Sequence, residues 1–597
     1  MNALTLIIAA ALILMLAYRF YGDFISAKVL ALDSSVTTPA VRLEDGQDYV
    51  PTNKWVVFGH HFAAIAGAGP LVGPVLAAQF GYLPGTLWIL IGAVLGGAVH
   101  DAVVLFASIR HDGKSLSEIA KEEIGPITGF ITGIAILFII TITMAGLAMV
   151  IVNALYKNAW GVFTISMTIP IAVFVGIYMH KLRPGKLGEA SVIGVVLILL
   201  AVAMGPVIKN SPLAYLFFYD IKTLEIILPV YGFVAAALPV WLLLAPRDYL
   251  SSYMKIGTIA ALALGIVFVH PQLQMPAVTQ FIHGGGPIIN GKLWPFLFIT
   301  IACGAVSGFH ALIASGTTSK MLKDEGEIRL VGYGGMIMEA FVAMMALIAA
   351  TVLAPGDYFA INTAPAVFAN LGMQVKDLPI LSQMVGENVA GRPGGAVSLA
   401  VGMAHIFSSI PCMKWLMAYW YQFAIMFEAL FILTTIDAGT RVARYIAQDF
   451  LGLIYKPLKN SKSIILSIVL SALVSFTWGY LLYGGDITTI WPIFGVSNQL
   501  LATLALAIGS NMILRHTKKL SYMMTTFIPM LFMGITSSTA GYLTIVNNYI
   551  PKHQILPAVL AGLMIILAAI IVVDSIRKIL QTYSSISNGL VQKVAAK

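Results

Sequence analysis

Residues 59–81 read GHHFAAIAGAGPLVGPVLAAQFG, an apolar stretch with glycine and proline at its centre. Proline removes a backbone donor and clashes with the preceding turn, and glycine lowers helix propensity, so Gly67–Pro70 and Gly73-Pro74 predict a helix that is interrupted midway. In a membrane, the freed backbone groups must face protein or a water-filled cavity. Such a broken helix is the usual basis of a transporter's binding site. The alternative is a kinked packing helix whose glycines let neighbours approach.

The composition of the chain predicts an all-α polytopic membrane protein. Of its 597 residues, 59% are hydrophobic and 10% are charged, whereas soluble domains have about 25% charged residues. The apolar residues form blocks of about twenty, the length needed to cross a ~30 Å hydrocarbon layer, and we expect about 15–18 transmembrane helices. The net charge of +9 is typical of basic cytoplasmic loops and does not indicate nucleic-acid binding.

No motif of an enzyme, an ATP-driven pump or a cofactor site is present. The sequence lacks a Walker A loop, a Rossmann fingerprint, a hydrolase elbow and an HExxH helix. Its two cysteines, Cys303 and Cys412, have no ligand-like spacing, so neither a disulfide framework nor a metal site is expected. We therefore expect no cofactor.

Apolar blocks and basic loops divide the chain into five parts. These are an N-terminal transmembrane helix (1–26), a cytoplasmic linker (27–53), a first core repeat (54–210), a second core repeat (211–436) and a C-terminal helical extension (437–597). The distribution of lysine and arginine predicts an outside N-terminus and a cytoplasmic C-terminus. The number of crossings within 396–455 stays open, because about forty apolar residues at its start exceed one crossing.

A second interrupted span is predicted at Glu225–Tyr253, where Pro229, Pro239 and Pro246 fall within apolar sequence that ends beside Arg247 and Lys255. It lies five spans after the first interruption and runs in the opposite direction. Two such helices are typical of a five-plus-five inverted repeat whose breaks hold the substrate. In this alignment, 293–319 is one span that packs against the first broken helix. The predicted substrate contacts are His61, Gly67, Ala68, Gly69, Pro70, Trp241 and Leu242.

Two adjacent histidines, His60 and His61, begin the first broken stretch. Neighbouring residues on a helix point about 100° apart, so at most one of them can face the cavity. Packing against other helices is the alternative for both.

Three titratable residues within spans are candidates for ion coupling. His100, Asp101 and His310 lie in apolar sequence, where each charge costs about 2.5–3.5 kcal/mol on insertion scales. Histidine titrates near neutral pH and can carry a proton. These residues could instead tie helices together by hydrogen bonds. Glu339, Glu428 and Asp437 are further buried candidates.

Hydroxyl groups near residue 317 predict a possible cation site. Ser315, Thr317 and Thr318 could provide oxygen ligands for sodium beside an unwound helix. The alternative is that these hydroxyls bond to carbonyls of their own helix. Asn498 and Gln499, in a later span, are predicted to join helices.

Several long strings resemble the carbon starvation protein A family. They are GHHFAAIAGAGPLVGPVLAAQFGYLPGTLWI (59–89), GAVHDAVVLFASIRHDGKSLSEIA (97–120), SGFHALIASGTTSK (307–320), TTIDAGTRVARY (434–445) and WPIFGVSNQLLA (491–502). The resemblance implies a secondary active transporter of the inner membrane that imports short peptides or pyruvate, with proton symport in close relatives. It also implies kinship with the amino acid–polyamine–cation superfamily. Its partners would be the substrate, a proton or sodium ion and the lipid bilayer. A non-transporting nutrient sensor is the alternative outside this class.

Overall fold

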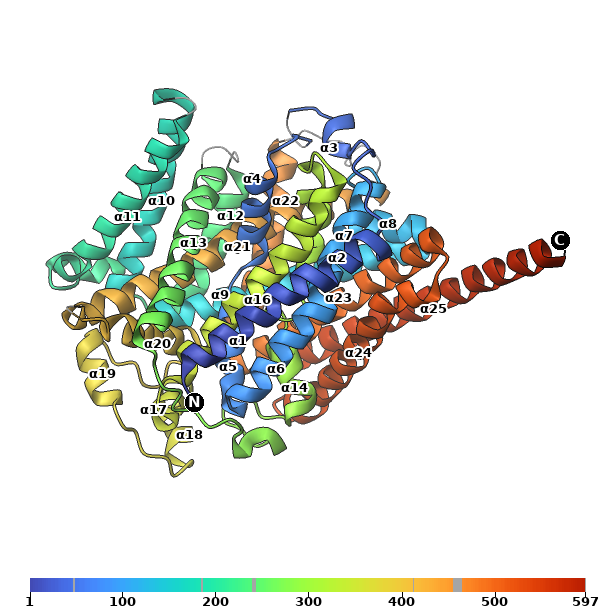
Figure 1. Ribbon diagram of the computed structural model, residues 1–597. Coiled ribbons are helices and arrows are strands. Elements are labelled where there is room, and N and C mark those ends of the chain that lie inside the picture. The colour runs from blue at the N-terminus through green and yellow to red at the C-terminus, as the bar shows by residue number, and fades with distance from the viewer. Residues whose placement is uncertain (47–48, 184–185, 239–242, 412, 455–463, 596–597) are drawn as a thin grey trace.

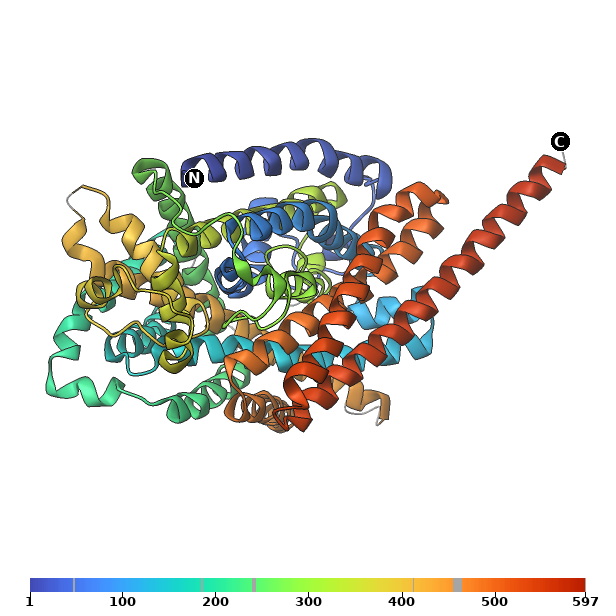
Figure 2. The same cartoon turned by 90° about the horizontal axis from the view of Figure 1, so that it is seen from below.

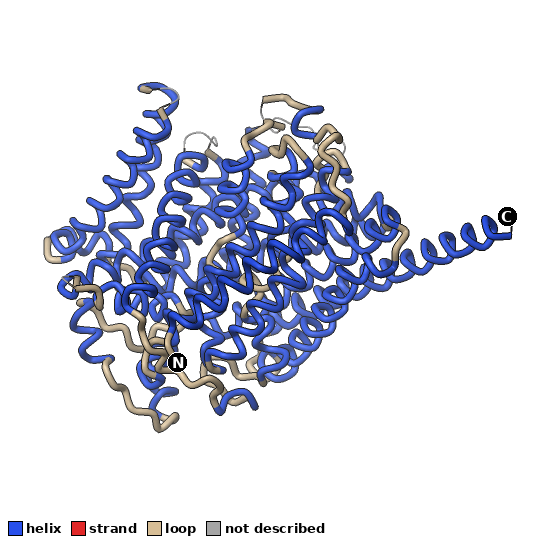
Figure 3. Tube along the Cα trace, in the orientation of Figure 1, coloured by secondary structure: helices blue, strands red, loops and turns tan. Residues whose placement is uncertain are grey.

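The protein is an all-helical membrane protein. The computed structural model describes residues 1–597 except 47–48, 184–185, 239–242, 412, 455–463 and 596–597 (Figure 1). Within these residues, extended pairing is limited to three isolated bridges (Figure 3). In the described part of the chain, eleven helices are long and apolar enough to cross a membrane, or up to twelve if the bent pair near residue 67 is one span. This number is below the predicted 15–18, because several apolar blocks form short or interrupted helices.

The first interruption lies where glycine and proline predicted it. Helix α4 (Lys54–Ile65) ends at Ala66, whose ψ of 72° is not helical, and α5 (Gly69–Ala77) begins three residues later. The two halves meet at an angle of 46°. Pro70 stands in the first turn of α5, where its missing N–H would have no helical partner in any case. The prediction of a broken helix at this place is confirmed.

The region 225–253 differs from its prediction. It contains two separate helices, α12 (Ile221–Ala237), which tolerates Pro229 in its interior, and α13 (Leu244–Val269). One helix ends at Ala237 and the next begins at Leu244, where the prolines predicted a break, but α13 continues past Tyr253 to Val269, so the predicted bounds of this span were wrong. Arg247 and Lys255, expected at a cytoplasmic end, are each 1% exposed within α13. Pro239, Trp241 and Leu242 lie outside the described residues.

The second interruption is found instead in the predicted span 293–319. Helix α14 (Leu293–Thr300) is followed by non-helical residues 301–308 and then by α15 (Phe309–Gly316). Asn498 satisfies the freed backbone, because its Oδ1 accepts from the N–H of Phe309 at 2.9 Å and its carbonyl accepts from Gly308 at 3.1 Å. The prediction of one continuous helix at 293–319 was therefore wrong.

The two broken helices are antiparallel and touch at their breaks. At one face, the N–H of Thr52, before α4, donates to Met321 O, after α15, at 2.9 Å. At the opposite face, the N–H of Leu83 donates to Ala277 O at 3.0 Å, which joins the end of the first broken helix to the loop before α14. Between these faces, Gly69 packs directly on Cys303. The interruptions therefore meet near the centre of the molecule.

The remaining helices enclose this pair (Figure 1). Those nearest to it are α6 (Tyr82–Gly92), continued through a π turn (Ala93–Gly97) into α7 (Ala98–Arg110), and α16 (Gly334–Thr351). Further out lie α8 (Leu116–Glu123), α9 (Pro126–Leu155), α10 (Ala159–Ile177), α11 (Leu187–Lys209), α20 (Ala396–Ser408) and α21 (Met417–Ile454). Short helices α17 (Pro355–Asn362), α18 (Pro365–Ala369) and α19 (Leu378–Val385) lie at one end.

The two ends of the chain lie at the periphery. Helix α1 (Ala3–Leu16), followed by the short α2 (Gly22–Phe24) and α3 (Pro39–Arg42), runs along the edge of the bundle in Figure 2. The C-terminal helices are α22 (Ile464–Gly484), α23 (Ile487–Thr517), α24 (Leu520–Thr544) and α25 (Ile555–Ala595). Helix α23 is buried along its length, whereas the last turns of α25 project from the body (Figure 2). In the stretch where the number of crossings was open, α20 has 13 residues and α21 continues for 38.

Candidate functional site

A fully buried chain of titratable groups lies directly beside the second break. Helix α7 contributes His100 and Asp101, α15 contributes His310 and α16 contributes Glu339, and all four are 0% exposed. His310 is the second residue of α15, so it stands immediately after the non-helical stretch. The structure therefore brings together the three titratable residues among those predicted for ion coupling and adds Glu339.

Asp101 is held between two histidines. Its Oδ1 lies 2.7 Å from His100 Nδ1, and its Oδ2 lies 2.8 Å from His310 Nδ1. A carboxylate can only accept hydrogen bonds, so an ionised Asp101 fixes both imidazoles with the proton on Nδ1. Without such partners, a buried carboxylate would be very costly.

His310 connects Asp101 to Glu339. Its Nε2 lies 3.0 Å from Glu339 Oε2, an ion-pair distance without hydrogen-bond alignment. With Nδ1 protonated, one further proton can reside either on Nε2 or on the glutamate. The arrangement can thus load and release a proton at one place.

His61 belongs to a neighbouring contact between the two broken helices. Its Nδ1 lies 2.9 Å from Thr318 Oγ1, which joins α4 to the turn after α15. His61 is 0% exposed, whereas His60 is half-buried. Of the adjacent pair, His61 is therefore the one that faces the other broken helix.

The other predicted hydroxyls bond within their own chain segment. Ser315 Oγ donates to Ala311 O at 2.7 Å and Thr317 Oγ1 to Ile313 O at 3.2 Å, both four residues earlier. For Ser315 and Thr317, the structure therefore shows bonding to carbonyls of their own helix, which was the predicted alternative to a sodium site.

A buried lysine caps the first break. Lys255 Nζ donates to the carbonyl of Ala63 at 2.8 Å and lies 3.5 Å from that of Ala66, the last residues of the α4 half. It also lies 3.4 Å from Thr434 Oγ1 on α21. A cation is favourable at a helix C-terminus, so Lys255 stabilises the interruption.

A buried ion pair lies nearby on α13 and α21. Arg247 Nη1 donates to Asp437 Oδ2 at 3.2 Å, and the hydroxyl of Tyr231 donates to the same oxygen at 2.7 Å. Arg441, one turn after Asp437, donates from its Nη2 to Leu238 O at 2.6 Å.

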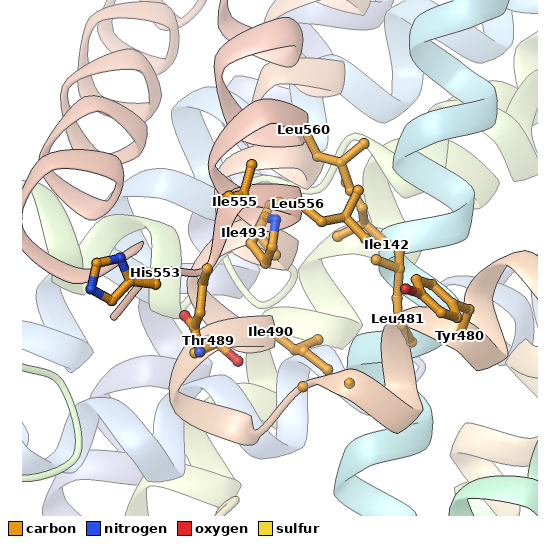
Figure 4. Close-up of a pocket in the computed structure, with 15 residues that line it drawn as sticks. Ile142, Tyr480, Leu481, Thr489, Ile490, Ile493, His553, Ile555, Leu556 and Leu560 are labelled. Atoms are coloured by element: carbon orange, nitrogen blue, oxygen red, sulfur yellow. The ribbon is translucent and has the colours of Figure 1, made fainter. Parts of the chain in front are cut away.

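Among the cavities formed by the described residues, one lies away from the breaks and another borders the second break. One of about 290 Å³ is lined mainly by aliphatic residues of α9, α22, α23 and α25, with His553 at one side (Figure 4). It contains no residue of either broken helix. The other, of about 520 Å³, borders Leu76 near the end of α5 and Thr300 at the end of α14.

Sequence reasoning missed two members of the central region. Glu339 was named only as one of several buried acids, and Lys255 was taken for a loop residue. Among the described residues, no three His, Cys, Asp or Glu side chains are placed to hold a metal ion.

Together these features define a polytopic helical membrane protein whose core holds two touching helix breaks and a buried chain of titratable side chains. The chain belongs to the carbon starvation protein CstA family, whose model matches residues 2–540. It is 56% identical over 582 residues to the peptide transporter CstA of Bacillus subtilis, with 97% of each chain covered. It is 48% identical over 589 residues to the pyruvate/proton symporter BtsT of Escherichia coli, covering 90% of this chain and 81% of that one.

The family and its relatives identify this protein as a transporter and not an enzyme. The predicted family resemblance is confirmed. A solved manganese transporter of Eremococcus coleocola (mutant H236A) aligns with a TM-score of 0.43 and 13% identity over 92% of this chain and all of that chain. This alignment is too distant to bear on the site.

Proposed function

We propose that the protein imports a small carboxylate-bearing nutrient, a short peptide or pyruvate, together with a proton across the inner membrane. The observation that carries this proposal is the position of Asp101 between His100 and His310, fully buried and next to the second break. Ionisable residues inside membrane spans mark proton and substrate pathways. Movement at the break would change the surroundings of His310 and thereby couple its proton to transport.

The substrate would bind between the two breaks. Helix α5 begins at the first break with Gly69, and helix α15 begins at the second break with Phe309. Helix N-termini attract a carboxylate, which peptides and pyruvate share. His61, Gly67, Ala68, Gly69 and Pro70 remain the proposed contacts.

Two observations favour a proton over sodium as the coupling ion. Ser315 and Thr317 direct their hydroxyls to carbonyls of their own helix. In addition, the E. coli relative is named as a pyruvate/proton symporter.

We further propose an inverted-repeat core with the N-terminus outside and the C-terminus in the cytoplasm. Antiparallel broken helices support the repeat. The N–H of Ala3 donates to Pro271 O at 2.9 Å, so the N-terminus shares a face with the loop before α14. The basic ends Arg515 and Lys518 support a cytoplasmic location for the loop between α23 and α24.

Uptake by purified protein in proteoliposomes tests the proposal. Labelled dialanine or pyruvate should accumulate when the outside is acidic, and a sodium gradient alone should not drive accumulation. Asp101→Asn should abolish accumulation but retain exchange of labelled for unlabelled substrate. Asp574→Asn, the same change on α25 outside the site, should behave as the wild type. Unchanged accumulation by Asp101→Asn would remove Asp101 from the coupling mechanism.

A further inference from the structure

A further cavity lies between the ends of α7 and α23. Its volume is about 330 Å³, near the lower end of the range of small-ligand sites. The spans Tyr82–Arg110 and Ile487–Thr517 both finish here, so the cavity lies at a boundary between membrane and water, which is the cytoplasmic one in the proposed orientation. Its lining combines four basic side chains with one acid and two apolar groups, which are Arg110, His111, Arg515, His516, Glu123, Phe106 and Met512.

The two arginines of the cavity keep most of their hydrogen-bond donors for a ligand. Arg110 Nη2 donates to Glu325 Oε1 at 2.8 Å, and Arg515 Nη1 donates to Glu123 Oε2 at 2.8 Å. Within the described residues, each guanidinium group uses one nitrogen for these bonds, whereas its planar fork carries donors on all of its nitrogens. The arginine side chains are 29% and 51% exposed, so both can reach a ligand in the cavity.

Glu123, the acid in the lining, has both carboxylate oxygens occupied. Its Oε1 lies 3.0 Å from His111 Nε2, and its Oε2 accepts from Arg515. His111 Nδ1 lies 2.7 Å from Ala107 O. Because carboxylate and carbonyl oxygens only accept, these two contacts place a proton on each nitrogen of His111. The hydrogen bond to Glu123 raises the pKa of His111, which favours this charged form.

The balance of charge around the cavity is positive. Three cations, the two arginines and protonated His111, are bonded to two acids, Glu123 and Glu325. Glu325 is fully buried and lies outside the lining. Glu122, 4.0 Å from His111, is itself paired with Lys114 at 2.6 Å. One positive charge therefore remains for an anion to balance.

Phe106 brings basic groups of two helices together. The guanidinium carbon of Arg110, on α7, lies 5.2 Å from the centre of the Phe106 ring. The ring of His516, on α23, packs against Phe106 in a T-shaped arrangement with the ring centres 5.8 Å apart. The basic side chains thus converge on one place instead of being scattered over the surface. Basic pockets between transmembrane helices at a membrane surface are typical of sites for phosphate-bearing headgroups.

We propose that this cavity binds a phosphate group, carried either by an anionic phospholipid or by a soluble phosphate. Arginine matches phosphate oxygens with parallel, charge-assisted hydrogen bonds. Arg110 is nine residues from Asp101, or about 13 Å along α7, so this site is separate from the buried titratable chain. A bound phosphate would join the end of α7, which carries Asp101, to the end of α23, which carries Asn498.

Calorimetric titration of the full-length protein in dodecyl maltoside tests the site, with inorganic phosphate as the probe at constant ionic strength. The wild type should bind phosphate saturably, and Arg515→Gln should weaken binding at least tenfold, the effect of one hydrogen bond to a charged group. Lys518→Gln is the matched control, because it removes the same charge three residues later, at an exposed position outside the cavity. It should leave the affinity unchanged. Equal unfolding temperatures of the two variants check that both are folded.

A second titration of the same protein distinguishes the two sources of phosphate. The probe is short-chain phosphatidylglycerol, and phosphatidylcholine with the same acyl chains corrects for binding of the chains. Phosphatidylglycerol that binds more tightly than inorganic phosphate, and is weakened by Arg515→Gln, assigns the site to an anionic lipid. Phosphatidylglycerol that binds no more tightly assigns it to a soluble phosphate.

Two results would overturn the phosphate site. One is the absence of saturable binding of both inorganic phosphate and phosphatidylglycerol. The other is equal weakening by Arg515→Gln and Lys518→Gln, which is the behaviour of a diffuse basic surface. None of these measurements depends on transport, so a failure of proton-driven uptake would overturn the proposed function alone.

Discussion

Gly69 and Cys303 pack against each other where the two broken helices meet, and a β-carbon built on Gly69 would overlap both Cβ and Sγ of Cys303. Hydrogen is therefore the only side chain that this contact admits. The close approach brings the N-terminal end of α5 against the non-helical stretch between α14 and α15.

We expect Gly69→Ala to destabilise the protein by about 1–3 kcal/mol, the usual cost of overpacking, and to reduce transport. Thermal unfolding in detergent and uptake measure the two effects. Gly59→Ala is the control, because no atom lies within 4 Å of a β-carbon there. Adding Cys303→Gly should recover part of the loss, and strictly additive effects would contradict direct contact.

Lys255→Met should lower the unfolding temperature, because two carbonyls at the end of α4 lose their donor. An unsatisfied buried group costs about 1–3 kcal/mol. Lys323→Met, at an exposed position, should have no measurable effect. If both variants unfold like the wild type, Lys255 does not support the break.

Glu339→Gln should uncouple transport from the proton gradient, because glutamine cannot exchange a proton with His310. Gradient-driven accumulation should fall roughly tenfold or more, equivalent to about 1.4 kcal/mol. Exchange of labelled for unlabelled substrate at equal pH on both sides should continue. A variant that still accumulates substrate normally would exclude Glu339 from the proton path.

Glu387, in the loop between α19 and α20, should make stability depend on pH. Burial raises the pKa of Glu387 from 4.5 to about 7, against the attraction of Arg392 and Lys209 and the hydrogen bond from Gln422. The folded protein then binds this proton more tightly than the unfolded chain does. The stability contributed by Glu387 should therefore fall as pH rises from about 4.5 to 7 and stay constant above that range.

Glu387→Gln removes this effect and can still accept the bond from Gln422. Relative to the wild type, the variant should gain about 2–3 kcal/mol of stability between pH 4.5 and pH 8. Unfolding curves at both pH values measure this gain. Glu118→Gln, on the exposed side of α8, should show no such pH-dependent difference.

The sequence predicted the first break because Gly67–Pro70 combines two helix-breaking residue types within four positions. The second break was missed because residues 301–308 contain glycine but no proline. Its interruption depends on Asn498, almost two hundred residues later, which replaces the lost helical bonds. Such a long-range partner leaves no local signal.

In the region 221–269, the proline and basic residues led to wrong predictions of where helices are interrupted and where they end. Pro229 lies inside a regular helix, and the basic residues Arg247 and Lys255 are buried. Their charges are balanced by Asp437 and by helix-end carbonyls, so the rule that places basic residues in cytoplasmic loops did not apply. For Asp101, by contrast, the cost of burying a charge correctly indicated close partners.

The contact between Gly69 and Cys303 lies where four half-helices end, α4 and α15 on one side of it and α5 and α14 on the other. The helical hydrogen bonding is not continuous from α4 to α5 or from α14 to α15. In the proposed transport cycle, the pair of half-helices on one side of this junction would tilt while the opposite pair stays in place, which would open the centre of the protein toward one side of the membrane at a time without unwinding a helix.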